Sequence, residues 1–207
     1  MQHYFSAQPQ SASRPGRVSF SYRGCDVALD TDSGVFSRTE LDRGTWELLS
    51  ALPQELSGDL LDMGCGYGPI GVAAGRRWPG LSVTMTDVNP RACALAGQNA
   101  QKNGVTARAL VGDGYETLEG ERFDWILQNP PIRAGKAVMY RLFAQAAAHL
   151  KPGGQLWLVM RKQQGAASAM TYLATLFGAV DCVAKKGGYW VLRCQTPLKD
   201  ESKGQGA

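Results

Sequence analysis

The segment LLDMGCGYGPIG, residues 60–71, carries glycines and an acid at spacings that suit a nucleotide-like ligand. Gly66, Gly68 and Gly71 match the G-x-G-x-x-G pattern of dinucleotide-binding loops. Gly64, Gly66 and Gly68 instead match the shorter G-x-G-x-G pattern of loops that bind S-adenosylmethionine. Glycine lets the backbone turn sharply and approach a ligand that a Cβ atom would exclude. This loop alone leaves both interpretations open.

Three acids end three successive expected strands. Asp62 precedes the first glycine, where the dinucleotide pattern keeps an apolar residue, and a carboxylate there suits a sulfonium amino acid better than a pyrophosphate. Asp87 ends the second strand and can accept hydrogen bonds from both ribose hydroxyls. Asp113, in GDGYE after the third strand, can accept an adenine amino hydrogen. Each acid alone is an ordinary turn or cap residue, but the three together favour S-adenosylmethionine over NAD.

The segment QNPPIRAGK, residues 128–136, follows the fourth expected strand. Its prolines could simply stop that strand. Asn129, however, offers a carbonyl acceptor, and Pro130 and Pro131 lack amide hydrogens, so that carbonyls can point outward from a stiff segment. Two converging acceptors can hold the planar exocyclic amine of guanine or adenine. Such an amine needs positioning and electrostatic help rather than a strong base.

The composition is that of a globular chain, since 207 residues with 44% hydrophobic content suffice for one domain with a substantial core. The net charge of +4 alone says little about a nucleic-acid partner. The five cysteines are scattered without a C-x-x-C or a nearby histidine pair, so we expect neither a metal site nor a disulfide framework. Without a long apolar run or a signal peptide, the chain is expected to be cytoplasmic and to have no membrane partner.

The elements that position these segments follow from apolar periodicity. We expect a flexible arm over residues 1–17, a hairpin about Arg23-Gly24 and a helix that starts near Thr39. Alternating strands and helices follow, with strands at 59–63, 81–87, 106–112, 122–128 and 155–160, and helices at 69–78, 89–104, 136–150 and 165–177. This alternation predicts an α/β protein with a parallel sheet covered on both faces.

The last two expected strands depart from this alternation of strands and helices. Strands expected at 179–186 and 188–195 are joined by Gly187-Gly188, a link too short for a crossover, so they must be antiparallel neighbours. The last residues, 196–207, are charged and contain glycine, and we expect a disordered tail.

Two helix boundaries carry local signals. Asn89 is the expected N-cap of the helix that Pro90 opens and Gly104 stops. The turn Lys151-Pro152-Gly153-Gly154, residues 151–154, is expected to close the helix at 136–150.

In their order and spacing, LLDMGCGYGPIG, TDVNP, GDGYE and QNPPIRAGK resemble the motifs of class I S-adenosylmethionine-dependent methyltransferases. Within these, the chain looks like the methyltransferase small domain group of ribosomal RNA guanine-N2 methyltransferases (RsmC-like), to which DSGVFSRTELDRGT is also similar. The resemblance covers about residues 18–195. It implies one domain with a Rossmann-like doubly wound seven-stranded sheet, an antiparallel last strand, and an N-terminal hairpin and loop extension at 18–37.

The resemblance also implies roles for individual residues. The S-adenosylmethionine contacts would be Asp62, Gly64, Cys65, Gly66, Gly68, Asp87, Val88, Asp113, Gly114 and Asn129. Catalysis would rest on Asn129, Pro130 and Pro131, and the substrate would contact Phe36, Ile132, Arg133 and Lys136. Relatives usually carry a degenerate second copy of the domain ahead of the catalytic one. Many amino methyltransferases have an aromatic residue where Ile132 stands.

Basic residues bear on the partner. Arg133 and Lys136 flank the proline segment, and Arg161-Lys162 follow the fifth strand on the same rim, where they would contact phosphates of ribosomal RNA or a ribosomal subunit. Lys185-Lys186 are expected at the opposite end of the sheet, as solvated surface charge. The predicted reaction is transfer to guanine N2. An adenine amine, a protein glutamine amide and a non-catalytic RNA-binding domain remain alternatives, and the oligomeric state stays open.

Overall fold

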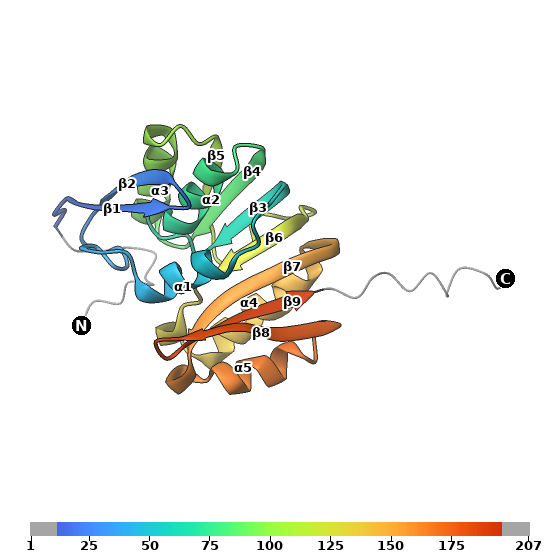
Figure 1. The fold of residues 1–207 in the computed structure, drawn as a ribbon. Coiled ribbons are helices and arrows are strands. Elements are labelled where there is room, and N and C mark those ends of the chain that lie inside the picture. The colour runs from blue at the N-terminus through green and yellow to red at the C-terminus, as the bar shows by residue number, and fades with distance from the viewer. Residues whose placement is uncertain (1–11, 196–207) are drawn as a thin grey trace.

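The computed structural model describes residues 12–195 (Figure 1). Its centre is a seven-stranded mixed sheet in the order β5-β4-β3-β6-β7-β9-β8. The strands are β3 (Gly58–Met63), β4 (Leu81–Asp87), β5 (Ala107–Val111), β6 (Phe123–Gln128), β7 (Leu150–Arg161), β8 (Ala179–Lys186) and β9 (Tyr189–Gln195). The first five are parallel, whereas β9 is antiparallel to both of its neighbours. The predicted fold class is confirmed.

Five α-helices cover the two faces of this sheet among the described residues (Figure 1). One face carries α1 (Arg43–Ala51), α2 (Pro69–Arg77) and α3 (Pro90–Lys102), and the other carries α4 (Lys136–Ala148) and α5 (Ala166–Leu173). Each face has its own apolar core, because successive side chains of a strand point to opposite sides of the sheet. Leu127 lies in the first core and its neighbour Ile126 in the second.

The N-terminal hairpin packs outside the sheet, on α2 and α3. Its strands, β1 (Gly16–Tyr22) and β2 (Cys25–Thr31), join at Arg23 and Gly24, which both have positive φ, as a two-residue hairpin turn requires. The side chain of Asn99 in α3 bonds both the N–H and the carbonyl of Asp30, at 2.8 and 2.9 Å. It thereby continues the ladder of β2 and fixes the hairpin to the helix.

The strand order reverses between β3 and β6, where β4 lies on one side and β7 on the other. Ligands of doubly wound sheets bind beyond the carboxyl ends of the strands at such a point. The segments that leave β3 and β6 at this edge are the glycine loop and the proline segment. The topology therefore brings together two motifs that are about sixty residues apart in the sequence.

Helix α1 begins later than the periodicity predicts, at Arg43 rather than near Thr39. Asp42 is the N-cap, and its carboxylate accepts a hydrogen bond from the N–H of Thr45. The residues before Arg43 do not extend the helix, because the backbone of Asp42 is not helical, with a φ of −58° and a ψ of 136°. The predicted ends of α3 are confirmed: Asn89 caps it, Pro90 opens it, and Gly104 follows it with a φ of 67°.

Three expectations for the C-terminal half were wrong. Residues 151–154 do not close α4, which ends at Ala148; they lie within β7, where its register with β6 shifts. Helix α5 ends at Leu173, four residues early. Lys185-Lys186 do not lie at the opposite end of the sheet. Lys186 pairs with Tyr189, which pairs with Arg161 at the carboxyl end of β7, so both lysines share the edge that carries the glycine loop.

The chain ends carried two further expectations. The flexible arm over residues 1–17 lies largely outside the described residues, and the disordered tail over 196–207 lies entirely outside them. The part of the arm that is described is attached to the fold, since the N–H of Arg14 donates to Asp32 at 2.5 Å. No helix between residues 12 and 195 is long and apolar enough to cross a membrane.

Candidate functional site

The glycine loop between β3 and α2 is held by backbone bonds and turns at its glycines. Gly64, Gly66 and Gly68 have φ values of 72°, 55° and 89°, a region that L side chains rarely adopt. The N–H groups of Gly64 and Cys65 both donate to the carbonyl of Thr86, at 2.8 Å. A Cβ atom at Gly64 or Gly66 would meet no atom within 4 Å, so the loop faces open space there.

Asp87 ends β4 beside this loop. Its Oδ2 accepts from the N–H of Gly66 at 2.8 Å, and its Oδ1 accepts from the N–H of Asn89 at 2.9 Å. Burial raises the pKa of the Asp87 carboxyl, an effect that these backbone donors partly offset. The carboxylate therefore fixes the glycine loop to the start of α3 while it lines a cavity between them.

Asp62 lies behind the loop rather than in front of it. It is fully buried, and its Oδ2 accepts from the N–H of Gly71 at 2.8 Å. Burial, with a smaller contribution from the charge of Asp87, raises the pKa of Asp62 to about 7. A Cβ atom on Gly71 would come within 2.9 Å of Met85, so this glycine lets α2 approach the sheet. In this structure Asp62 therefore supports the loop.

Two cavities flank the loop and share Gly64, Asp87 and Asn129 in their walls. The first, which we name the loop cavity, is also lined by Val35, Thr45, Cys65, Gly66 and Tyr67. The second, the Asp113 cavity, is also lined by Val88, Asp113, Gly114, Pro131 and Arg141. All the predicted cofactor residues line one or both, except Asp62 and Gly68.

Asp113 does not stand alone at its strand end. Its Oδ1 accepts from Nη2 of Arg141 in α4 at 2.7 Å, and its side chain is 52% exposed. No sequence motif points to Arg141, because it follows Asp113 by 28 residues and lies within α4.

Asn129, the first residue after β6, lies where three cavities meet. Its Nδ2 donates to Oδ2 of Asp42 at 3.0 Å and to Oγ1 of Thr45 at 3.1 Å. The carbonyl of Pro130 accepts from the N–H of Ile132, and that of Pro131 accepts from the N–H of Ala134, both at 2.9 Å. Each proline carbonyl thus retains one lone pair rather than two.

The third cavity, which we name the acceptor groove, is lined in part by Asn129 and Pro130. Its other walls come from four separate segments, through Phe36, Asp42, Ile132, Arg133, Arg161 and Tyr189. Phe36 is 44% exposed, the only large aromatic side chain among the described residues with that degree of exposure. The predicted contact Lys136 lies outside this wall, with its Nζ 5.0 Å from the ring of Tyr140.

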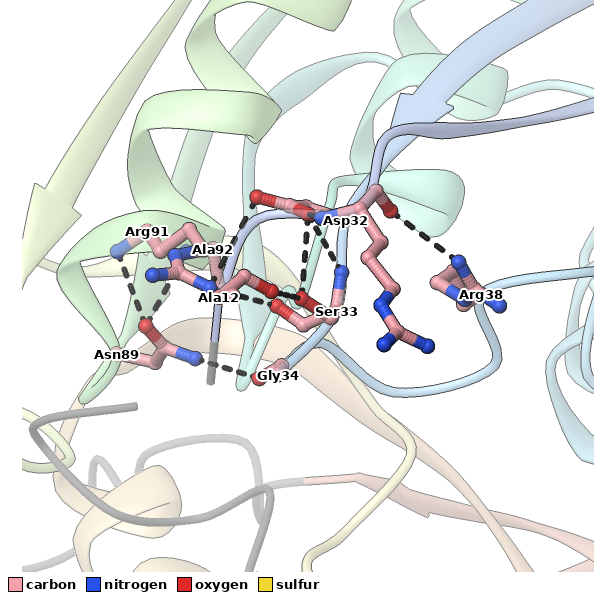
Figure 2. Close-up of polar contacts among 9 residues, drawn as sticks. Ala12, Asp32, Ser33, Gly34, Arg38, Asn89, Arg91 and Ala92 are labelled. Atoms are coloured by element: carbon pink, nitrogen blue, oxygen red, sulfur yellow. Dashed lines mark hydrogen bonds and ion pairs between the residues drawn. The ribbon is translucent and has the colours of Figure 1, made fainter. Parts of the chain in front are cut away.

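The segment that carries Phe36 is bound to the start of α3 (Figure 2). Nδ2 of Asn89 donates to the carbonyl of Gly34 at 3.0 Å, and Nη1 of Arg91 donates to the carbonyl of Ser33 at 2.9 Å. These bonds hold Val35 and Phe36 over the loop cavity. Asn89 was predicted as a helix cap, but its second role depends on a partner 55 residues earlier.

The two cavities beside the loop fit S-adenosylmethionine. The open space at Gly64 and Gly66 admits a ligand close to the backbone. Asp87 ends β4, the strand beside the one that leads into the glycine loop, as a ribose-binding acid does. The buried hydroxyl of Tyr67 lines the loop cavity without a hydrogen-bond partner in the described chain, so the cavity also offers a polar group to a ligand.

Comparisons with known proteins agree with this geometry. The profile of the family "Methyltransferase small domain" matches residues 26–193. The chain is 41% identical to "Uncharacterized protein YbxB" of Bacillus subtilis (strain 168), over 94% of this chain and 98% of that protein. It is 36% identical to "Ribosomal RNA small subunit methyltransferase C" of Photorhabdus laumondii subsp. laumondii, over 83% of this chain and 51% of that protein.

A solved structure extends the likeness to three dimensions. The T. thermophilus 16S rRNA N2 methyltransferase RsmC, in complex with AdoMet and guanosine, superposes with a TM-score of 0.80 at 29% identity. The match covers 91% of this chain and 52% of that one, so the chain spans about half the length of these rRNA methyltransferases. By its fold, its glycine loop and its matching profile, the chain belongs to the methyltransferase small domain family of class I S-adenosylmethionine-dependent methyltransferases.

Proposed function

We propose that this chain methylates an exocyclic amine, namely guanine N2 of ribosomal RNA. The observation that carries the proposal is the position of Asn129, whose amide lies between the cofactor cavities and the acceptor groove. Bound S-adenosylmethionine supplies an electrophilic methyl group on a sulfonium. The chain's own residues must then hold the two reactants and orient the amine.

The donor would be held by the groups that line the two cavities beside the glycine loop. Asp87 would accept hydrogen bonds from the ribose, and Asp113 from the adenine amine, with Arg141 fixing its carboxylate. The glycine loop would pass close to the amino-acid portion. Asp62 would contribute through the loop that it supports, since it bonds the N–H of Gly71.

The acceptor amine would be oriented by the oxygen of the Asn129 side chain and the remaining lone pair of the Pro130 carbonyl. Both are acceptors, so they would align the two N–H bonds of the amine. Pro131 stiffens the segment as the residue that precedes the short helix η1 (Ile132–Ala134). This arrangement contributes positioning and electrostatics, which suits an amine whose lone pair is delocalised.

Phe36 offers the aromatic surface that position 132 lacks. It lines the acceptor groove together with the proline segment, and it is substantially exposed. A purine drawn into the groove could stack on its ring, while Ile132 packs from the other segment. The T. thermophilus enzyme, an N2 methyltransferase of 16S rRNA with guanosine bound, supports guanine over adenine. The names of the curated relatives support ribosomal RNA as the substrate.

A cationic rim surrounds this groove, which supports RNA as the partner. We use this name for Arg133, Lys136, Arg161, Lys162, Lys185 and Lys186, all exposed at the carboxyl edge of the sheet. Within residues 12–195 none of the six forms an ion pair with a carboxylate, whereas Arg77, Lys102, Arg108 and Arg193 elsewhere each do. Cations without a carboxylate partner on one rim suit a phosphate backbone. A ribosomal RNA substrate would also agree with the predicted cytoplasmic location.

The direct test is an assay of purified protein with labelled S-adenosylmethionine and ribosomal RNA from a strain lacking the gene, followed by digestion to nucleosides. We expect label in N2-methylguanosine. Label in N6-methyladenosine would replace guanine by adenine as the target. In a parallel reaction with intact ribosomal particles, label found only in the protein fraction would favour a glutamine amide as the target. No transfer to any of these, with normal binding of S-adenosylmethionine, would contradict the proposal.

A further inference from the structure

The N-cap of α1 does more than begin a helix. Oδ2 of Asp42 accepts from the N–H of Thr45 at 2.9 Å, and the same oxygen accepts from Nδ2 of Asn129 at 3.0 Å. Oγ1 of Thr45 accepts from the same Nδ2 at 3.1 Å. Both donors of the Asn129 amide are thereby taken by the first turn of a helix more than eighty residues earlier.

This contact selects one of the two orientations of the amide. A carboxylate has no hydrogen to donate, so it accepts from the NH₂ group and repels the carbonyl oxygen. Thr45 alone would not discriminate, because a hydroxyl can donate as well as accept. With Nδ2 facing Asp42, the oxygen of Asn129 is directed away from α1. Within the described residues this oxygen has no hydrogen-bond partner of its own.

The packing of α1 keeps Asp42 in place. A Cβ atom on Gly44 would lie 2.9 Å from Oδ2 of Asp42 and 2.9 Å from Cε1 of Tyr189, so only glycine allows this approach. Nε of Arg161 donates to the hydroxyl of Tyr189 at 2.8 Å, which anchors that ring in turn. Thr45 is 3% exposed. The orienting oxygens therefore sit on a rigid turn, as a precise site requires.

We propose that Asp42 and Thr45 are positioning residues for Asn129, which fix its carboxamide so that the oxygen faces the amine to be methylated. The inference rests on the proposed transfer to an exocyclic amine and adds the residues that orient the acceptor. A reversed amide would present its NH₂ group to the amine, donor against donor. Misplacement of about 1 Å can cost on the order of 100-fold in rate, so the turnover should depend on this contact.

Three substitutions of Asp42 separate orientation from capping and from proton transfer. Asp42→Ala removes both hydrogen bonds. Asp42→Ser keeps a good N-cap but is too short to reach Asn129. Asp42→Asn cannot take up a proton but keeps an acceptor oxygen. The N–H of Thr45 would hold this oxygen as the helix cap, so the same oxygen would still face Nδ2 of Asn129. We expect kcat to fall about 10- to 100-fold in Asp42→Ala and Asp42→Ser, with the acceptor KM nearly unchanged, and to recover largely in Asp42→Asn.

Two results would overturn the proposal. Wild-type kcat in Asp42→Ser would show that Asp42 acts only as a helix cap. Loss in Asp42→Asn equal to that in Asp42→Ala would assign Asp42 a proton-accepting role instead. At the second position, Thr45→Ser should retain kcat and Thr45→Val should lower it, although Val keeps the branched shape of Thr and Ser loses a methyl group.

A readout without substrate separates this inference from the proposed function. The two side-chain amide protons of Asn129, followed by NMR in the free protein, should exchange with solvent faster in Asp42→Ser than in the wild type. Unchanged exchange would contradict the positioning role even if RNA methylation is observed. Faster exchange in a protein that methylates no RNA would leave the contact established and the proposed reaction wrong.

Discussion

Asn129 is the polar residue common to the cofactor cavities and the acceptor groove, and its surroundings explain why an uncharged amide can serve there. His149, the one histidine among the described residues, does not line these cavities, and the same residues contain no cluster of side chains that could hold a metal ion. The groups beside Asn129 are hydrogen-bond acceptors and stiff backbone. The chemistry at residue scale is therefore orientation of a weak nucleophile.

Replacing Asn129 by Ala should abolish turnover and leave the affinity for S-adenosylmethionine nearly intact, because only one wall residue of the cofactor cavities is shortened. Steady-state kinetics and calorimetric titration with S-adenosylmethionine measure the two quantities. More than about a tenth of wild-type activity, equivalent to a loss below roughly 1.4 kcal/mol, would contradict the positioning role.

Asp62 should make the stability of the cofactor-free protein fall as the pH rises. Its pKa is raised to about 7 by burial, whereas an unfolded chain releases this proton near pH 4. Between these values the folded state binds more protons than the unfolded state, so raising the pH favours unfolding. Asp62→Asn removes this titration and should keep the bond to Gly71. The wild-type Tm should therefore drop more than the Tm of Asp62→Asn between pH 5 and pH 8.

A control for this experiment is Asp59→Asn. The hydrogen bond from Lys151 lowers the pKa of Asp59, so its titration lies below the tested range. The Asp59 variant should keep the wild-type difference in Tm between pH 5 and pH 8. Parallel curves of Tm against pH for the wild type and Asp62→Asn would contradict the prediction, since they would show that the Asp62 carboxyl is ionised over the whole range from pH 5 to pH 8.

At residue scale, the sequence predicted the groups that belong to contiguous motifs. Gly64 and Asn129 follow strands directly and Asp87 ends one, and a parallel sheet must bring these strand ends together. Asp42 and Tyr189 could not be found in this way. Each belongs to an element whose local pattern indicates only a helix cap or a strand, and tertiary packing alone brings it to the site.

At the scale of elements, the hairpin and α3 act as one support for the glycine loop. Asn99 is fully buried, and besides bonding Asp30 its Nδ2 donates to the carbonyl of Tyr67 at 2.9 Å. Asn103, one turn later, bonds the N–H and the carbonyl of Ala28, at 3.1 and 2.9 Å, without touching the loop. The two asparagines therefore offer a matched pair of variants.

Asn99→Ala and Asn103→Ala should each lower the free energy of unfolding, by about 1 kcal/mol, because partly buried backbone groups of β2 lose their partners. Asn99→Ala should in addition weaken the binding of S-adenosylmethionine, since it frees the carbonyl of Tyr67. Urea unfolding and calorimetric titration measure the two effects. Equal affinities in both variants would mean that the hairpin does not support the loop.

The elements themselves were largely predictable, and the exceptions share a cause. The alternation of strands and helices predicted the parallel strands, and the short link at Gly187-Gly188 predicted that β8 and β9 are antiparallel. The orientation of this β8–β9 hairpin in the sheet, however, depends on which other strand β9 pairs with. Its pairing with β7 brings Lys185-Lys186 to the edge with the glycine loop. Residues 151–154 have the composition of a turn, yet they continue β7 because its partner β6 begins beside Leu150. Neither pairing is visible in local sequence.

At the scale of the whole molecule, the charges of the described residues are arranged asymmetrically. The cationic rim lies at the carboxyl edge of the sheet, around the acceptor groove. At the far end of α2, Arg77 has a carboxylate partner in Glu55. A phosphate backbone that crosses the site would therefore meet cations beyond the groove itself.

Reversing both charges at Lys185 and Lys186, by substitution with Glu, should weaken RNA binding and lower its dependence on salt. Each lost phosphate contact should reduce the slope of log K against log salt concentration by about 0.7 to 0.9. Fluorescence anisotropy with labelled RNA over a range of salt concentrations gives the slope. The matched control, the double change Arg76→Glu and Arg77→Glu at the opposite edge, should leave it unchanged. Equal slopes in both double variants would exclude the two lysines from the RNA path.

Mass spectrometry of ribosomal RNA nucleosides from a strain lacking the gene tests the central claim most directly. The account predicts the loss of one N2-methylguanosine, restored by a plasmid copy of the wild-type chain and not by the Asn129→Ala variant. An unchanged set of methylated nucleosides, or restoration by Asn129→Ala, would contradict it.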